Sequence, residues 1–485
     1  MATLLSLLEG LPGFDRSVLT DLPIRSIVLD SRQATVQSLF VALPGQHQHG
    51  ADFAADAVRR GAVAVISSAS RPSGWPPVIP WIQTDNPRMW LPTLAARLYQ
   101  FPARRLTLYG VTGTNGKTTT VYMLAAILRR AGRRVAFWST NQVEGIPHPY
   151  RPAMTTPDSP ALHEFLRQAV DTGAEDVLLE VSSHALALNR IGGLRFAAVA
   201  VTNITPDHLD FHGSFADYVA AKASIVQYVK PGGAVILNGD DPVISGWQTP
   251  AVVTRTTYGF SGTHPLTARI IESHADHSRW EWFWQNQSYG EIVLPVPGRH
   301  NIQNALAALG MALHCGIAPD VARDALAHFV PAPRRLETVT QGDITVVSDV
   351  AMNRASYEAV LATVHSLGRP VVVVNAIRGN RGPDINRDIV DVLADWADHM
   401  AFAPVIATLS TDQVASLSVD YRVRPDEQAA FLEQANRRGL AVICTDTLEA
   451  AIDAALARLP KGGILLLLGT FGMDAGLALV RDRIG

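Results

Sequence analysis

A glycine-rich stretch that contains one lysine is the first candidate for chemistry in this chain. It reads GVTGTNGKTTT at residues 110–120 and ends, like a phosphate-binding P-loop, in Gly-Lys-Thr. The usual P-loop pattern has a glycine five residues before the last one, and Val111 occupies that position. The stretch is therefore either a chance lysine in a glycine-rich turn or a shorter kind of phosphate loop.

The residues on either side of the loop favour phosphate binding. The apolar run LTLYGV before it predicts a strand, and KTTTVYMLAAILRRAG after it predicts a helix that stops at Gly132. Backbone N–H groups between a strand and a helix N-terminus attract phosphate, and the helix dipole adds to this. Lys117 can then reach the terminal phosphates of a nucleotide, while the Thr118 hydroxyl is a candidate Mg²⁺ ligand.

Acidic and histidine residues follow two more predicted strands in the same region. Glu180 ends the apolar run DVLLE, and Asp207 and His208 follow FAAVAVTN. Ligands of parallel sheets collect at the carboxyl ends of the strands. A single Glu or His is more often structural, but its place beside a phosphate loop favours a functional role. Because Mg²⁺ prefers carboxylate oxygen, His208 is the less expected ligand.

Lysine is rare in this chain, which makes each one informative. It occurs only at positions 117, 222, 230 and 461, so 37 of the 41 basic residues are arginine. Lys222 lies within SFADYVAAKASIVQYV, a predicted helix with Ser214 and Asp217 placed for a capping-box-like start. A neutral lysine amine can form a carbamate with carbon dioxide, which arginine cannot do because it stays protonated. Composition alone leaves a carbamate and an ordinary surface charge both open.

The length and the breaks in the pattern predict three α/β domains. A chain of 485 residues exceeds a single core. We place the domains at 1–104, 105–332 and 333–485, with linkers at FPARR and VPAPRRLE. The first is a small α/β unit, and the second is a larger sheet domain around the phosphate loop. In the third, strands such as PVVVVNA and GGILLLLGT alternate with helical stretches, which predicts a doubly wound, Rossmann-like sheet.

The composition excludes several classes of partner. A net charge of −3 and a pI near 6.6 give no sign of a nucleic-acid or membrane surface. Cys315 and Cys444 form no metal or disulfide spacing, the N-terminus does not resemble a signal peptide, and ILLLLG is too short to span a bilayer. We expect a soluble cytoplasmic monomer without nucleic-acid or membrane partners.

Five segments together resemble the Mur ligase family: GTNGKTT, EVSSHAL, TNITPDHLDFHGSFADYVAAK, GRHNIQNALAA and PRRLE. Within the family the chain is most similar to the tripeptide-synthetase type, and the short loop with Val111 is the family's own form. The resemblance implies an ATP-dependent amino-acid ligase of peptidoglycan precursor synthesis. In such a reaction a carboxylate of UDP-N-acetylmuramoyl-L-alanyl-D-glutamate is phosphorylated to an acyl phosphate, which the amine of a free amino acid then attacks. The expected cofactors are ATP and Mg²⁺.

The resemblance also implies roles for individual residues. The catalytic set comprises Lys117, Glu180, His208, Lys222, Arg335 and Asp349. The implied ATP contacts are Gly113, Thr114, Asn115, Gly116, Lys117, Thr118, Thr119, Asn304 and Arg335. The implied metal ligands are Thr118, Glu180, His208 and Lys222 as its carbamate. Contacts to the UDP-sugar and the dipeptide are expected from Ser31, Thr155, Thr156, Ser182 and Arg190. The two threonines equally suit a helix-capping turn, and both roles can coexist.

The third domain departs from the family pattern. Val350 and Met352 replace a Tyr and a His expected near the nucleotide. In the second domain, Leu188 replaces a glutamine in the dipeptide-binding segment. The Asp-Asn-Pro-Arg motif that reads diaminopimelate is absent from its place, where LSTDQVAS stands, and LGTFGMD replaces the late Gly-Lys-Gly-His-Glu segment. A DNPR at residues 85–88 lies in the wrong domain and is interpreted as coincidence.

These departures leave the substrate open. Lysine or ornithine is expected as the added amino acid in preference to diaminopimelate. A first alternative is a related amide ligase that acts on a different amine or carboxylate outside the main wall pathway. A second is a nucleotide-binding regulatory subunit with little ligase activity. The second alternative does not explain why Lys117, Glu180, His208 and Lys222 occur together.

Overall fold

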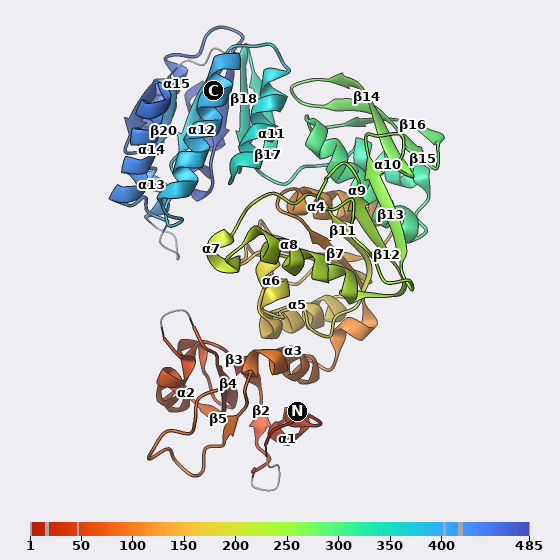
Figure 1. The fold of residues 1–485 in the computed structure, drawn as a ribbon, viewed down its shortest axis with the longest axis vertical. Coiled ribbons are helices and arrows are strands. Elements are labelled where there is room, and N and C mark those ends of the chain that lie inside the picture. The colour runs from red at the N-terminus through yellow and green to blue at the C-terminus, as the bar shows by residue number, and fades with distance from the viewer. Residues whose placement is uncertain (1, 15–18, 46–47, 401–403, 416–420, 485) are drawn as a thin grey trace.

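Three α/β domains follow one another along the chain. The computed structural model describes residues 2–14, 19–45, 48–400, 404–415 and 421–484. Figure 1 shows the domains in chain order, from the red and orange N-terminal part through the green central part to the blue C-terminal part. This confirms the predicted three-domain α/β architecture, while the exact domain boundaries remain predictions.

The N-terminal domain is built on a parallel sheet in the order β3-β4-β5-β6. Its elements are β1 (Ala2–Thr3), α1 (Leu4–Leu8), β2 (Pro23–Ile24), β3 (Ser26–Val28), η2 (Ser31–Gln33), β4 (Ser38–Ala42), η3 (Gly50–Phe53), α2 (Ala54–Arg59), β5 (Ala62–Ser67), β6 (Trp81–Gln83) and α3 (Pro87–Leu98). Helix α3 begins with a proline, which costs nothing at the first helical position. Arg97 on α3 donates to the Leu7 carbonyl at 2.7 Å and ties α3 to α1.

The central domain is a ten-stranded sheet in the order β16-β15-β14-β13-β12-β11-β7-β10-β8-β9. Its strands are β7 (Thr107–Thr112), β8 (Val135–Trp138), β9 (Val143–Glu144), β10 (Asp176–Glu180), β11 (Phe196–Val201), β12 (Val229–Asn238), β13 (Thr254–Gly259), β14 (Leu266–Ser273), β15 (Ser278–Trp284) and β16 (Gln287–Leu294). Its helices are α4 (Lys117–Arg130), α5 (Ser159–Asp171), α6 (Ser183–Ala187), α7 (Leu209–His212), α8 (Phe215–Ala223), η5 (Ser224–Tyr228), α9 (Arg299–His314) and α10 (Pro319–Ala327), and η4 (Pro102–Arg105) leads into the domain. Helices α4, α9 and α10 cover one face of the sheet, and α5, α6 and α8 cover the other.

Two features of the central domain differ from the sequence expectation. The helix predicted around Lys222 is α-helical only to Ala223 and continues as η5, so Lys222 lies near the end of α8. The antiparallel extension β14–β16 was not predicted at all. Its signal is the alternation in SRWEWFW, where Trp280 and Trp282 are fully buried.

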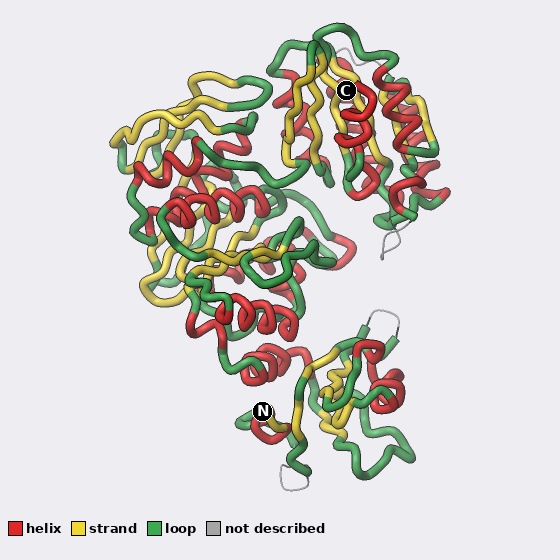
Figure 2. Tube along the Cα trace, turned by 180° about the vertical axis from the view of Figure 1, so that it is seen from behind, coloured by secondary structure: helices red, strands yellow, loops and turns green. Residues whose placement is uncertain are grey.

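The C-terminal domain has the predicted doubly wound sheet, in the order β17-β18-β22-β19-β20-β21. Its elements are β17 (Arg335–Gln341), β18 (Ile344–Asp349), α11 (Arg354–His365), β19 (Val371–Ala376), α12 (Pro383–Met400), β20 (Val405–Thr408), α13 (Thr411–Val414), α14 (Pro425–Arg438), β21 (Val442–Thr445), α15 (Leu448–Leu456), β22 (Ile464–Leu468), η6 (Phe471–Met473) and α16 (Gly476–Ile484). Only β17 runs antiparallel to its neighbour. Figure 2 shows the yellow strands of this sheet between red helices. Of LSTDQVAS, Ser416 lies outside the described residues.

The register of three central strands positions the site. Glu180 at the end of β10 pairs with Val111 in β7, and Val201 at the end of β11 pairs with Thr112. The phosphate loop therefore leaves the sheet between Glu180 on one side and the segment that leads to His208 on the other. This is the carboxyl edge at which parallel sheets bind ligands.

No helix in the described ranges is long and apolar enough to cross a membrane.

The centre of the C-terminal sheet is expected to control the stability of that domain. Leu466 in β22 is fully buried between two neighbouring strands. Leu466→Ala should cost about 2–5 kcal/mol because it leaves a cavity in a packed core. Differential scanning calorimetry should show a lower midpoint for the C-terminal transition. Val330→Ala, at a side chain that is 78% exposed, is the control and should leave that midpoint unchanged. Equal shifts for the two variants would contradict the prediction.

Candidate active site

The phosphate loop has a backbone that only glycine can adopt at two positions. Gly113 has φ +144° and Gly116 has φ +86°. A Cβ at Gly113 would collide with the Thr202 hydroxyl, and one at Gly116 would collide with the Asn304 side chain. Val111 lies inside β7 and is fully buried, so the P-loop glycine that is missing from this sequence would fall within the strand.

Asn203 fixes the start of the loop. Its carbonyl accepts the Thr114 N–H at 2.7 Å, and its side-chain oxygen accepts the Asn115 N–H at 2.9 Å. The first N–H groups of α4, which begins at Lys117, have no intrahelical acceptors. The loop is therefore held in place by its neighbours and leaves the helix N-terminus available to an anion.

Two lysines meet at a single carbonyl of the loop. Lys117 Nζ donates to the Gly113 carbonyl at 2.9 Å and to the Thr114 carbonyl at 2.9 Å. Lys222 Nζ donates to the same Gly113 carbonyl at 2.7 Å. Lys222 also lies over the ring of Tyr218, whose hydroxyl is 2.8 Å from the Thr114 hydroxyl. The structure thus brings the two lysines singled out in the sequence into one contact.

Lys222 is in an environment that disfavours its charge. The residue is only 2% exposed, and burial together with the nearby Lys117 holds its pKa well below the usual lysine value. Burial also lowers the pKa of Lys117, although Glu180 and Asp207 oppose that shift. A lowered pKa increases the neutral fraction of the Lys222 amine, which is the form that reacts with carbon dioxide.

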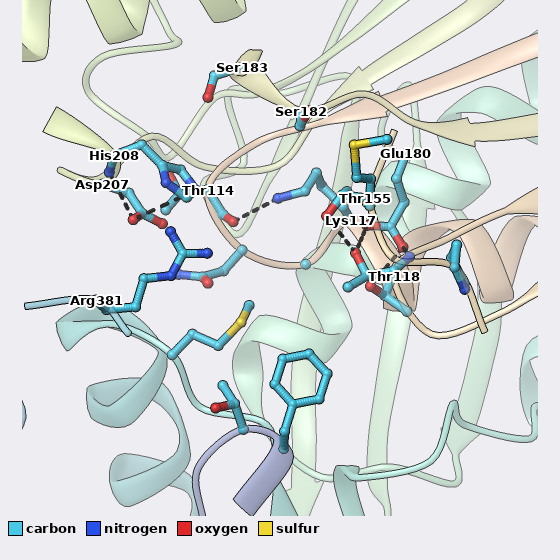
Figure 3. Close-up of a pocket in the computed structure, with 18 of the residues that line it drawn as sticks. Thr114, Lys117, Thr118, Thr155, Glu180, Ser182, Ser183, Asp207, His208 and Arg381 are labelled. Carbon is cyan, nitrogen blue, oxygen red and sulfur yellow. Dashed lines mark hydrogen bonds and ion pairs between the residues drawn. The ribbon is translucent and has the colours of Figure 1, made fainter. Parts of the chain in front are cut away.

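Glu180 and Thr118 form an oxygen-rich group beside the loop. Glu180 is buried, and its carboxylate accepts the Thr118 hydroxyl at 2.8 Å. It also accepts the backbone N–H of Thr140 at 2.8 Å and the Thr140 hydroxyl at 3.0 Å. A carboxylate facing a hydroxyl has the donor chemistry that Mg²⁺ prefers. Figure 3 shows this pair on one side of Lys117.

A cavity beside the phosphate loop, called the chamber from here on, is lined among others by Lys117, Thr118, Glu180, Asp207, His208, Lys222, Arg335 and Arg381. His208 lies next to Asp207, on the side of the chamber opposite Thr118 and Glu180 (Figure 3). It has a left-handed backbone with φ +53°, an uncommon conformation for a non-glycine residue that is found often at functional sites. Burial lowers the pKa of His208, while Asp207 acts against that shift. Within the described parts of the chain, no three His, Cys, Asp or Glu side chains form a ready metal cluster. Ligation by Thr118, Glu180, His208 and Lys222 therefore remains a prediction.

Asn353 of the C-terminal domain reaches across to the central domain. Its side chain accepts from Asn115 Nδ2 at 3.1 Å and donates to Asp207 at 3.1 Å. It also caps α11 by accepting the Ser356 N–H at 3.0 Å. One side chain thus connects the phosphate loop, the segment before His208 and the first helix of the C-terminal domain.

Arg335 lies between the chamber and a second cavity. Its Nη2 is 3.4 Å from the Thr118 hydroxyl, and its buried Nε has no hydrogen-bond partner. The residues before and after it, Arg334 and Leu336, both have positive φ. Asp349 accepts the Leu336 N–H at 2.9 Å, and burial raises its pKa. Arg335 is therefore held with a free donor at the boundary between the cavities.

The second cavity contains the residues expected to bind nucleotide. It is lined by Asn115, Gly116, Thr119, Asn203, Thr205, His300, Asn301, Asn304, Arg335, Asp349, Ala355, Ser356, Ala359 and Val360. Asn304 is buried in α9 and donates to Asn301 at 3.2 Å. The structure thus brings Asn304, Asp349 and Arg335 together beside the loop, from three separate segments of sequence.

The residues expected to bind the dipeptide divide into two groups. Thr155 and Ser182 line the chamber. Thr156 is 1% exposed and donates to the Glu180 carbonyl at 2.7 Å, while Arg190 donates to the Thr156 carbonyl at 2.9 Å and pairs with Asp158 at 2.8 Å. Neither Thr156 nor Arg190 is among the residues that line the chamber. Their substrate role stays a prediction, and the structure shows them supporting the turn that follows Thr155.

Ser31 lies in a separate cavity of the N-terminal domain. Its hydroxyl donates to Asp56 at 2.9 Å, and Arg32, Phe40, Gln48 and Phe53 are among the other lining residues. Figure 1 shows this domain below the central one, which contains the phosphate loop. The prediction that Ser31 contacts the UDP-sugar is untested.

Sequence reasoning missed several residues of the site. Thr140, Asn203 and Asn353 each contact a predicted site residue, yet none lies in a pattern that distinguishes it from an ordinary loop residue. For Asn203 the available signal was its place as the last residue of the run FAAVAVTN, two residues after the end of β11. Asn353 carried no signal beyond that of a helix cap, because its contacts join domains far apart in sequence.

The fit between Gly116 and Asn304 can be tested by substitution. Gly116→Ala should lower ATP-dependent turnover by about 100-fold or more. The new Cβ would collide with Asn304 and displace the loop, so that Lys117 and the phosphate would no longer be aligned. Steady-state phosphate release is the measurement. Gly132→Ala is the matched control, since Gly132 has a similar φ of +81° and nothing within 4 Å of its Cβ position. Comparable losses in both variants would show that backbone strain, rather than the contact with Asn304, is responsible.

Comparisons with known proteins agree with the three domains. Residues 23–99 match the model "Mur ligase family, catalytic domain", residues 111–312 match "Mur ligase middle domain", and residues 334–471 match "Mur ligase, glutamate ligase domain". A protein of Geobacillus kaustophilus named UDP-N-acetylmuramoyl-L-alanyl-D-glutamate--2,6-diaminopimelate ligase is 33% identical over 475 residues, which cover 96% of this chain and 94% of that protein. A protein of Solibacter usitatus with the same name is 36% identical over 362 residues, which cover 74% of this chain and 73% of its own.

Solved structures show the same fold. MurF from Acinetobacter baumannii superposes with a TM-score of 0.67 at 20% identity and covers 96% of this chain and 94% of its own. MurF from Thermotoga maritima, solved in complex with ADP, has a TM-score of 0.67 at 18% identity and covers 95% of this chain and 98% of its own. The matches to the family models and the relatives that span almost the whole chain together show that this chain belongs to the Mur ligase family.

Proposed function

We propose that this chain is an ATP-dependent ligase that adds an amino acid to UDP-N-acetylmuramoyl-L-alanyl-D-glutamate. The contact of Lys117 and Lys222 with the Gly113 carbonyl, beside the Thr118–Glu180 pair, carries this proposal. This arrangement places side chains that suit phosphate binding and oxygen donors that suit Mg²⁺ in one chamber. The names of the relatives support the carboxylate substrate.

The first half of the reaction requires charge neutralisation and alignment. The substrate carboxylate attacks the γ-phosphate of ATP, and an acyl phosphate and ADP result. The N-terminus of α4 and Lys117 face the transferring phosphate, and the unpartnered Nε of Arg335 is placed to stabilise its developing negative charge. Lys117 exchanges its bonds to two loop carbonyls for bonds to phosphate oxygens. Asn304 and Asp349 line the cavity assigned to the nucleoside.

The donors present fit a magnesium role. Thr118 and Glu180 would hold one ion, and His208 with a carbamate on Lys222 would complete the metal set. When bound, Mg²⁺ supplies positive charge that screens the phosphate oxygens. Conversion of Lys222 to a carbamate also removes a buried positive charge next to Lys117, which favours the modification.

The second half of the reaction joins the amine to the activated carboxyl group. The amine of the incoming amino acid attacks the acyl carbon, and phosphate leaves. Thr155 and Ser182 line the side of the chamber from which we expect the dipeptide to enter. Asn353 links the C-terminal domain to the phosphate loop, which places the domain expected to present the amino acid next to the acyl phosphate.

A substrate panel tests the proposal. Purified protein with UDP-N-acetylmuramoyl-L-alanyl-D-glutamate, ATP and Mg²⁺ should release phosphate only when an amino acid is added. Mass analysis should show the nucleotide substrate plus one amino acid minus water. Diaminopimelate is included because it occurs in the names of the relatives. Absence of phosphate release with every amino acid would refute the proposal, and turnover of another carboxylate would favour a related amide ligase.

The carbamate on Lys222 has a separate test. Lys222→Ala should lower turnover by about 100-fold or more, because a charged ligand is lost. Formate or another small carboxylate should restore part of this activity. Lys222→Arg should stay inactive, since arginine forms no carbamate. As controls, circular dichroism checks that each variant is folded, and mass spectrometry checks its covalent mass. Full activity of Lys222→Arg would exclude the carbamate role.

A further inference from the structure

This inference rests on the proposed ligase function and concerns the amino acid that is added. Three adjacent strands of the C-terminal sheet end together, because Leu468 in β22 is in register with Asp349 in β18 and Asn375 in β19. The loops after these strands converge on the chamber that contains Lys117. They supply Met352, Arg378, Gly379, Arg381, Thr470 and Phe471 to its wall.

The loop that carries Arg381 is rigidly held. Glu427 of α14 is fully buried, and its carboxylate accepts the backbone N–H groups of Asn380 at 3.2 Å, Arg381 at 2.9 Å and Gly382 at 2.8 Å. Asn386 accepts the Arg378 N–H at 3.0 Å and donates to its carbonyl at 2.9 Å. These contacts fix the direction in which the Arg381 side chain leaves the loop.

Arg381 presents an unpaired guanidinium to the chamber. Figure 3 shows it reaching toward the side on which Asp207 and His208 lie. No hydrogen bond or ion pair to its side chain is present among the described residues, whereas the neighbouring Arg378 donates to the Met352 carbonyl. A free guanidinium held on a rigid loop suits a carboxylate, which it can bind through two parallel hydrogen bonds.

The rest of this wall is aromatic and apolar. Phe471 stacks on Tyr421 with ring centroids 4.2 Å apart and planes at 25°. The Arg151 guanidinium covers the Phe471 ring from the central domain, at 4.9 Å from its centroid. Met352 and Tyr421 line the same chamber. Such a surface binds an apolar or aromatic side chain well.

No carboxylate on this wall is available to a distal ammonium group. The residues that the described C-terminal domain contributes to the chamber include no Asp or Glu. Asp474, just behind Phe471, already pairs with Arg151 at 2.7 Å and also with Arg334. On the central-domain side, Glu180 is bonded to Thr118 and Thr140. Asp207, the other central-domain carboxylate of the chamber, already accepts from Asn353 at 3.1 Å and from the His208 N–H at 2.9 Å. An ammonium group against Phe471 would therefore lose water, meet two arginines and find only carboxylates that are already bonded.

We propose that the acceptor is an α-amino acid with an uncharged, apolar or aromatic side chain. Its carboxylate binds Arg381, its side chain packs against Phe471, Tyr421 and Met352, and its amine faces the acyl phosphate. This differs from the lysine or ornithine expected from the sequence and from the diaminopimelate in the names of the relatives.

Isosteric acceptors give a direct test. L-norleucine and L-lysine differ only in the terminal group, and L-norvaline and L-ornithine form a second pair. With wild-type protein and the UDP-linked dipeptide, kcat/KM for norleucine should exceed that for lysine by about tenfold or more, as expected for an unpaired ammonium. Equal or better use of lysine or meso-diaminopimelate would overturn this inference and leave the ligase function intact. It would place the acceptor side chain in the neighbouring cavity near Asp210 and Asp384. No product with any amino acid would refute the ligase function itself.

Variants of the wall test the assigned contacts. Arg381→Met should raise KM for norleucine about tenfold or more with a smaller effect on kcat, and Arg381→Lys should recover part of the loss. Arg387→Met, on the adjacent helix α12 and paired with Asp384, is the control and should not change KM. Thr470→Glu should shift the lysine-to-norleucine ratio toward lysine, because it adds the missing counter-charge. An unchanged KM in Arg381→Met, or an unchanged ratio in Thr470→Glu, would contradict the proposal.

Discussion

The side-chain nitrogens of Lys117 and Lys222 both donate to the Gly113 carbonyl, at 2.9 and 2.7 Å. Two ammonium groups this close, in a buried place, repel each other and lose hydration. Glu180 and Asp207 offset part of this repulsion, and further negative charge or the neutralisation of one amine would relieve more of it. ATP would supply negative charge. A carbamate on Lys222 would remove the positive charge of that amine and add a negative one. The same contact therefore explains both the expected nucleotide and the expected modification.

The parallel sheet allows this contact to form. Lys117 begins α4 directly after β7, whereas Lys222 lies on α8, which follows the neighbouring strand β11. Gly113 is in the tight connection between β7 and α4, where a side chain would strike Thr202 at the end of β11. The ends of β7 and β11 can therefore approach this closely only because Gly113 has no Cβ. The loop is shorter than a standard P-loop because Val111 is still part of the strand.

Local patterns predicted the fold and the loop, but they did not predict contacts between distant segments. The loop, Glu180 and Lys222 were identified because strand–loop–helix order and residue type carry the signal. Asn353 was missed because its role depends on the approach of another domain to Asn115 and Asp207. Thr156 shows the reverse case, where a residue with an implied substrate role is buried against the Glu180 carbonyl. The burial of a polar side chain and its pairing with a distant segment are tertiary properties, so the local sequence pattern did not report them.

The two sides of the chamber have different proposed roles: the central domain serves phosphate transfer, and the C-terminal domain selects the amine. The central domain brings together two lysines, a carboxylate and helix N–H groups, which suit the proposed phosphate transfer. Among the residues that the structure describes, the C-terminal wall presents the unpaired guanidinium of Arg381 on a loop held by Glu427, next to stacked rings. Because Asp474 is already neutralised by Arg151 and Arg334, the wall selects by shape and by the exclusion of uncompensated positive charge. Arg151 lies four residues before Thr155, so the same ion pair also connects the acceptor wall to the segment expected to hold the dipeptide. The contacts expected to select the amine are therefore linked to those expected to hold the dipeptide.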